Sequence, residues 1–410
     1  MNVVKIFCQM ASIGVCILAV GCEQPVTDAP TTETDVNGGI SAPQFQVDPF
    51  WPKTLPNDML IGRIAGVAVD SQDRIFVVHR PGSLTNDELG LIQDPVKSLC
   101  CRPAPPVLVF DAEGNLLDSW GGPGEGYDWP GTEHGIFVDH NDNVWLGGEG
   151  IGDPELEEYA DHSTHGEDNP LCRDHFVLKF SNDGTFLMQI GEAGKTRGSN
   201  STEFLGHPAD VEVDPETNEV FVVDGYLNKR VIVFDAATGE YRRHWGAYGE
   251  MPDDLPIGRY QHNPDGPPAR EFTDAVHGIR IAKDGHVYVA DRGNGRIQIF
   301  TKDGTFVEEH FIVPETRVGS SSGSAWDIEL SPDEAQTYLY IADGTNQRVW
   351  ILQRDTMEIL DSFGRRGRGA GEFHWLHKFA ADSQGNIYTG EVHMQRRLQK
   401  FVVQNNVVTE

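Results

Sequence analysis

From Ala65 onward, the chain repeats one pattern of hydrophobic and polar positions six times. Each unit has a short apolar stretch, a turn rich in Asp, Asn and Gly, and a second apolar stretch, which is the pattern of a β-hairpin. Most units continue with a third and a fourth strand. The innermost strands begin at Ala65, His134, Ala209, His277, Trp326 and His377. Four strands per unit, repeated about every 50 to 75 residues, predict the blades of a β-propeller with inserted loops.

The end of the last unit predicts how the ring closes. Few residues follow the strand expected at 398–403, so the sixth blade lacks an outer strand of its own. Residues 45–49 could supply that strand, because a ring closed by both ends of the chain leaves no ragged edge. The sequence therefore predicts an all-β fold, a single six-bladed propeller of antiparallel four-stranded blades over residues 45–404, followed by a short tail at 405–410.

The first 44 residues predict export and a tether. Lys5 precedes a largely apolar run, residues 6–20, which is too short and too abruptly ended for a membrane span. Residues 18–22, Leu-Ala-Val-Gly-Cys, resemble the lipobox of bacterial lipoproteins, so we expect a lipoprotein signal peptide over residues 1–22 and a lipid on Cys22. Residues 23–44 are polar and rich in Pro and Thr, which predicts a disordered tether. The chain is thus expected to be lipid-anchored on the periplasmic or cell-surface side of a bacterial membrane.

Charge and cysteine content narrow the choice of partners. A formal net charge of −31 argues against nucleic acid, because phosphate binding depends on clustered Lys and Arg. We expect a monomer that meets the membrane only through its lipid. Export leaves Cys100, Cys101 and Cys172 in an oxidising compartment, where Cys172 could pair with either Cys100 or Cys101.

Equivalent positions in the blades carry the candidate chemistry. The residue that opens the innermost strand is a histidine in blades two, four and six, namely His134, His277 and His377. Alternate blades of a six-fold ring are related by about 120°, so three imidazoles at one level converge on the axis. Such a tripod leaves a fourth coordination position open, which is typical of catalytic zinc. His207 and His374 lie outside this slot, and we assign them no part in it.

The loop after the second strand of each blade faces the same mouth as the histidines. That loop carries Arg80, Tyr226 and Arg292 in blades one, three and four. Two guanidinium groups could hold a carboxylate by paired hydrogen bonds. A phenol beside a metal could move a proton.

Several segments carry a resemblance to a known family. D-G-Y-L-N-K-R-V-I-V-F, D-R-G-N-G-R-I-Q-I-F and D-G-T-N-Q-R-V-W-I-L resemble NHL repeats. Together with V-A-V-D-S-Q-D-R-I-F-V-V-H-R, they make residues 60–403 similar to the lyase domain of peptidylglycine α-amidating enzymes. That domain splits peptidyl-α-hydroxyglycine into a peptide amide and glyoxylate. The resemblance implies zinc on His134, His277 and His377, Tyr226 as the base, and Arg80 and Arg292 as active-site arginines.

The same resemblance implies a calcium ion that this chain is poorly equipped to hold. Its ligands would be backbone carbonyls at Val67 and Ile136 and an Asp directly after the third histidine. Here that position is Lys378, and an ammonium group repels calcium. We therefore expect either no calcium or a lysine that replaces its charge.

These features predict a zinc-dependent carbon–nitrogen lyase that acts on a small hydroxylated carboxylate or a peptide C-terminus. Two alternatives stay open. A tethered propeller that only binds a protein or small ligand would hold no stoichiometric transition metal. A calcium-dependent propeller of the lactonase type would need oxygen ligands at axial slots that hold imidazoles.

Overall fold

The computed structural model describes residues 40–150, 173–255, 266–273, 275–316 and 323–404. The predicted signal peptide with Cys22, most of the predicted tether, Cys172 and the predicted tail lie outside these ranges. Within them, no helix is long and apolar enough to cross a bilayer.

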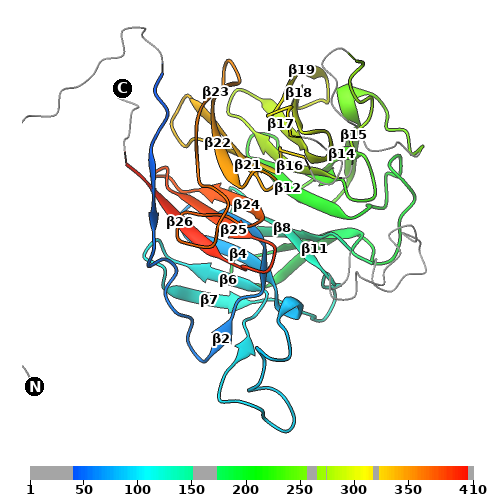
Figure 1. Cartoon of the computed structure of the whole chain (residues 1–410). Coiled ribbons are helices and arrows are strands. Elements are labelled where there is room, and N and C mark those ends of the chain that lie inside the picture. Colours follow the sequence, from blue (N-terminus) through cyan, green and yellow to red (C-terminus); the bar gives the residue numbers. More distant parts are fainter. Residues whose placement is uncertain (1–39, 151–172, 256–265, 274, 317–322, 405–410) are drawn as a thin grey trace, which may run out of the picture. The chain divides into compact units, whose positions relative to one another are not determined.

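Six four-stranded antiparallel sheets build the fold (Figure 1). Blade one contains β3 (Arg63–Val69), β4 (Ile75–Arg80), β6 (Val107–Phe110) and β7 (Leu116–Trp120). Blade two contains β8 (Glu133–Val138), β9 (Val144–Gly148), β10 (Phe176–Phe180) and β11 (Phe186–Gly191). Blade three contains β12 (Pro208–Asp214), β13 (Glu219–Asp224), β14 (Arg230–Asp235) and β15 (Tyr241–Trp245).

Blade four contains β16 (Val276–Ile281), β17 (His286–Asp291), β18 (Arg296–Thr301) and β19 (Phe306–Phe311). Blade five contains β20 (Asp327–Leu330), β21 (Tyr338–Asp343), β22 (Arg348–Gln353) and β23 (Glu358–Phe363). Blade six contains β24 (Leu376–Ala381), β25 (Ile387–Glu391), β26 (Leu398–Val403) and β1 (Phe45–Asp48). The short parallel pair β2 (Met59–Leu60) and β5 (Arg102–Pro103) and the 3-10 turns η1 (Pro81–Ser83), η2 (Ala247–Gly249) and η3 (Arg292–Asn294) lie in the connections.

The ring is closed by strand from both ends of the propeller, as the sequence predicts. β1 pairs antiparallel with β26, with Phe45 opposite Val403 and Asp48 opposite Lys400. The sixth blade therefore reaches four strands only by borrowing its outer strand from the N-terminal side. The six-bladed all-β fold is confirmed.

Each interface between neighbouring blades is one hydrophobic core. In β13, Val220 and Val222 pack toward blade two, whereas Phe221 and Val223 pack toward blade four. A strand that is buried on both faces needs apolar residues at consecutive positions. This explains why the middle strands of the blades read as continuous apolar runs and the outer strands alternate more clearly.

The innermost strands line the axis of the ring. They contact one another in the order β3, β8, β12, β16, β20, β24 and back to β3. In β3, β12, β16 and β24 a β-bulge falls on Ala65, Ala209, His277 and His377, and in β8 it falls just after His134. Bulges re-aim side chains, so His134, His277 and His377 can point toward the axis of the ring and not into the blade cores.

Candidate metal centre

The three histidines of the predicted tripod meet at one point. His134, His277 and His377 are fully or almost fully buried. Their ring centroids lie 4.7 to 5.0 Å apart. One ring nitrogen from each falls within 4.8 Å of the other two. Among the described residues, this is the group of side chains whose spacing suits a metal ion.

Each histidine of the tripod is oriented by the backbone of the next blade in the ring, which has no histidine at the equivalent position. Nδ1 of His134 lies 2.6 Å from the carbonyl oxygen of Ala209, and Nδ1 of His277 lies 2.6 Å from that of Trp326. A carbonyl only accepts, so Nδ1 carries the proton and Nε2 keeps its lone pair. The backbone of Ala65 interacts with His377 in the same sense, without the full hydrogen-bond geometry. The backbone carbonyls of Ala209 and Trp326 thus set the tautomers of His134 and His277, and Ala65 lies at the corresponding position for His377.

Burial lowers the pKa of all three imidazoles well below the usual value. Positive charges nearby, from Arg80, Arg292 and Lys378, lower these pKa values further. The rings are therefore neutral at physiological pH, which is the protonation state that binds metal.

Tyr226 adjoins the same nitrogens. Its Oη lies 2.9 Å from Nε2 of His134 and 3.1 Å from Nε2 of His277. One phenol proton cannot serve two lone pairs at once, so this buried cluster has more acceptors than donors. A divalent metal would supply the missing positive partner, and the residues present fit zinc.

Arg292 lies against the phenol. Its guanidinium stacks 5.3 Å from the ring of Tyr226 and 5.0 Å from that of Trp326, and Nη1 lies 3.4 Å from Tyr226 Oη. The 3-10 turn η3 directly after β17 holds it there, because Asp291 bonds Asn294 and Arg296 around the turn.

Arg80 reaches the centre from the end of β4, but it already has an acidic partner. Its Nη1 lies 2.9 Å from Oε1 of Glu149, and its Nε donates to the carbonyl of Glu133. The other carboxylate oxygen of Glu149 lies 3.6 Å from Nε2 of His134. Glu149 is a residue of this site that the sequence analysis missed.

A signal for Glu149 was present in the repeat. The register of strands one and two pairs Arg63 with Arg80 and Glu133 with Gly148. When the blades are aligned on Ala65, His134 and His277, Glu149 of blade two falls at the same position as Arg80 of blade one and Arg292 of blade four. Comparing the residues that follow the second strand of each blade would have identified Glu149.

Directly beyond the histidines, Lys378 occupies the channel. Its buried ammonium group donates to Asp210 Oδ2 at 2.9 Å, to Asp327 Oδ1 at 3.0 Å and to the carbonyl of His277 at 2.8 Å. Its three protons are thereby used, and none goes to the carbonyls of Val67 or Ile136. A fixed cation among these acids does not suit calcium, so we derive no role for that ion.

Lys378→Met is expected to lower the free energy of unfolding by about 3–5 kcal/mol, because it leaves Asp210 and Asp327 buried with too little positive charge. Chemical denaturation followed by fluorescence would measure the loss. Lys195→Met, which breaks an exposed pair with Glu192, should cost less than about 1 kcal/mol. Equal, small losses in both variants would contradict the counter-ion role of Lys378.

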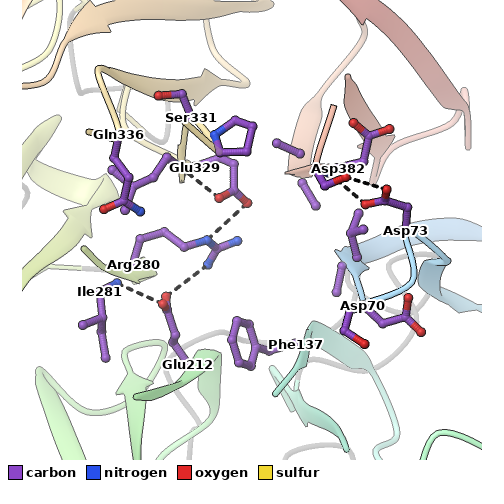
Figure 2. A pocket seen from close by; sticks show the side chains of 18 of the residues that line it. Asp70, Asp73, Phe137, Glu212, Arg280, Ile281, Glu329, Ser331, Gln336 and Asp382 are labelled. Carbon is purple, nitrogen blue, oxygen red and sulfur yellow. Dashed lines mark hydrogen bonds and ion pairs between the residues drawn. The ribbon is translucent and has the colours of Figure 1, made fainter. Parts of the chain in front are cut away.

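At the far end of the channel, a second charged layer borders a cavity of about 360 Å³ (Figure 2). Arg280 extends between Glu212 and Glu329, with Nε 3.4 Å from Glu329 Oε2 and Nη1 4.0 Å from Glu212 Oε2. Glu212 also accepts a hydrogen bond from the backbone of Ile281. Burial raises the pKa of Glu212 to about 8; Arg280 opposes the shift, whereas Glu329 and Asp210 add to it.

Glu212→Gln is expected to flatten the pH dependence of stability. The folded chain keeps the Glu212 proton to about pH 8, whereas the unfolded chain releases it near pH 4.5. The wild type therefore loses stability as pH rises between these values, and the amide variant loses less. Melting temperatures across pH 4.5 to 8 should show a gain for the variant that grows with pH. The exposed Glu192→Gln should show no such trend, and parallel curves for Glu212→Gln and wild type would refute the assignment.

The other predicted residues have different surroundings. His207 stacks on His175 at 4.4 Å, and His374 lies beside His393, so neither joins the tripod. The sulfurs of the adjacent Cys100 and Cys101 lie together. Because Cys172 is outside the described ranges, its pairing with either of them stays a prediction.

Comparison with known proteins agrees with the fold. The NHL repeat family matches residues 274–300. The peptidyl-glycine alpha-amidating monooxygenase B of Xenopus laevis is 25% identical over 374 residues, covering 85% of this chain and 34% of that protein. A probable peptidyl-alpha-hydroxyglycine alpha-amidating lyase of Caenorhabditis elegans is 24% identical over 253 residues, covering 59% of this chain and 56% of that protein. NHL repeat-containing protein 3 of Mus musculus is 27% identical over 276 residues, covering 65% and 60%.

Fold and repeat together define an NHL-repeat β-propeller. The chain is similar in sequence to proteins named peptidyl-α-hydroxyglycine α-amidating lyases and amidating monooxygenases, in agreement with the resemblance seen in its motifs. It spans about a third of the length of the amidating monooxygenases that it matches.

Proposed function

We propose that this chain is a zinc-dependent lyase that cleaves an N-acyl-α-hydroxyglycine or a similar carbinolamide into an amide and glyoxylate. The observation that carries the proposal is the convergence of three neutral imidazoles on a phenol, with the Arg292 guanidinium beside it. The names of the relatives support the same reaction class.

The chain's own residues account for the proton and the charge in this reaction. His134, His277 and His377 would hold the zinc, which makes a hydroxyl group bound to it more acidic. Tyr226 would act in its ionised form: its phenolate Oη accepts the hydroxyl proton, and the Arg292 guanidinium offers a positive charge beside it. The electrons of the O–H bond form the carbonyl of glyoxylate as the C–N bond breaks. The nitrogen takes the electron pair of that bond and the proton that Tyr226 accepted, so the phenolate is restored at the end of the cycle.

The substrate carboxylate needs a positively charged partner that is free to bind it. Nε of Arg292 is buried and has no hydrogen-bond partner in the part of the chain that the structure describes. A carboxylate placed there would complete its hydrogen bonding. This favours an α-hydroxy acid derivative over a neutral carbinolamide.

Metal analysis of the purified chain, combined with product analysis, tests the proposal. We expect about one zinc per chain and the release of glyoxylate and benzamide in equal amounts from N-benzoyl-α-hydroxyglycine. A zinc-loaded, folded chain that releases neither product would overturn the proposal and favour a propeller that only binds its ligand. NHL repeat-containing protein 3, a relative whose name states no activity, makes that second outcome a real alternative.

We further propose that the mature chain is exported and anchored through a lipid on Cys22, as residues 18–22 predict. Metabolic labelling with a radioactive fatty acid would show a labelled chain, and Cys22→Ser should abolish the label.

A further inference from the structure

The guanidinium of Arg80 is not free to bind a ligand as Arg292 is. Its ion pair with Glu149 joins two side chains that are each only about a tenth exposed, so the two charges largely cancel inside the site. Nε is committed to the carbonyl of Glu133. Only Nη2 remains without a hydrogen-bond partner among the described atoms. An incoming carboxylate would have to displace Glu149 to obtain two hydrogen bonds from Arg80.

The carboxylate of Glu149 also faces the reaction centre. Oε2 lies 3.6 Å from the Nε2 of His134 that would bind metal. Arg80, Arg292 and Lys378 all bring positive charge toward the histidines. Glu149 therefore places a negative charge on the Arg80 side of the centre, whereas Arg292 forms no ion pair with a carboxylate of the described residues.

The two sides of the centre thus differ in what they can accept. Two carboxylates held side by side in a site with little water repel each other strongly, so a ligand acid group is disfavoured beside Glu149. On the other side, Arg292 has an unused buried donor and is stacked on two aromatic rings.

We propose that Glu149 is a specificity-determining residue that restricts this site to ligands with a single carboxylate, bound by Arg292. Glu149 forms the ion pair with Arg80 that a second carboxylate of the ligand would otherwise form. Its negative charge favours a hydrogen-bond donor or a positive charge on that side of the ligand. The inference deepens the proposed function and rests on its assignment of the site.

Two small hydroxy acids test the inference without any turnover. Glycolate has one hydroxyl and one carboxylate, and tartronate has the same hydroxyl with two carboxylates. Isothermal titration calorimetry with the zinc-loaded full chain should show glycolate binding at least about tenfold more tightly than tartronate, a difference of about 1.4 kcal/mol. In Glu149→Gln, Arg80 is released, and tartronate affinity should rise at least about tenfold more than glycolate affinity.

A double variant separates release of Arg80 from a general loosening of the site. Arg80→Gln/Glu149→Gln removes both charges of the buried pair and leaves neither unpaired, so it also covers the case in which the single variant folds poorly. It should gain clearly less tartronate affinity than Glu149→Gln, because no guanidinium is freed to bind the second carboxylate. Arg292→Gln should lose binding of both acids, and the exposed Glu192→Gln should behave as wild type.

An unchanged ratio of the two affinities in Glu149→Gln would overturn the inference, as would a gain of equal size in the double variant. Failure of glycolate to bind the wild type would overturn it as well. Because binding is the readout, a chain that shows the expected ratios but releases no glyoxylate would disprove the lyase activity and leave the role of Glu149 standing.

Discussion

His134→Ala, His277→Ala and His377→Ala are each expected to abolish stoichiometric zinc binding. Even residues that only support a metal ligand typically cost about 10–100-fold in metal affinity when they are replaced, so loss of a ligand itself should cost at least about a hundredfold. The three rings are equivalent by position in the repeat, and Nδ1 of His134 and of His277 makes the same kind of hydrogen bond to a backbone carbonyl. The three variants should therefore fail alike.

Zinc content after dialysis against a weak chelator would measure this loss, with circular dichroism as the check on folding. His286→Ala is the matched control, because His286 lies in the same blade as His277 but is partly exposed. A tripod variant that folds and keeps as much zinc as His286→Ala would refute the prediction that these three histidines are the metal ligands.

Tyr226→Phe is expected to keep zinc and fold yet lower kcat by about a hundredfold or more, the usual size of a lost general base. The phenol contacts two of the histidines through its oxygen, whereas the ring packs against Arg292. Phenylalanine keeps the ring contact and removes only the oxygen. The loss should therefore fall on the chemical step more than on substrate binding.

Steady-state kinetics on N-benzoyl-α-hydroxyglycine would separate kcat from KM in this variant. Tyr241→Phe serves as the control, since Tyr241 lies on an outer strand and bonds the nearby His244. Metal content must match the wild type for the comparison to count. A Tyr226→Phe variant with full turnover would exclude the phenol as the proton acceptor.

The repeat explains why so much of the fold and of the tripod could be predicted from the sequence. Each blade is a local unit, so its hairpin pattern is visible in a stretch of the chain without knowledge of its neighbours. Equivalent positions in a closed ring lie at equal height around one axis. For this reason the positions of His134, His277 and His377 in their units already implied that the rings converge. The loop that follows strand two likewise placed Tyr226 and Arg292 at the same mouth.

Contacts between blades could be decided only by the tertiary structure. Lys378 reaches Asp210 across 168 positions of sequence and Asp327 across 51, and no local pattern reports such a meeting. The sequence showed that a lysine stands where calcium would need an acid, but the side chains that receive its charge depend on ring closure and side-chain reach. The carbonyls of Ala209 and Trp326, which set the histidine tautomers, were equally hidden, because a backbone atom leaves no mark in residue identity.

The pairing of Arg80 with Glu149 depends on both the sequence and the tertiary structure. The position of Arg80 in the repeat predicts a guanidinium at the mouth of the channel, where it would bind the substrate carboxylate. The structure gives it to a carboxylate of the next blade at 2.9 Å. Residue type and position determine which charges come near the centre, whereas burial and distance decide which charge is already satisfied, because a buried ion pair is broken only at a cost of several kcal/mol.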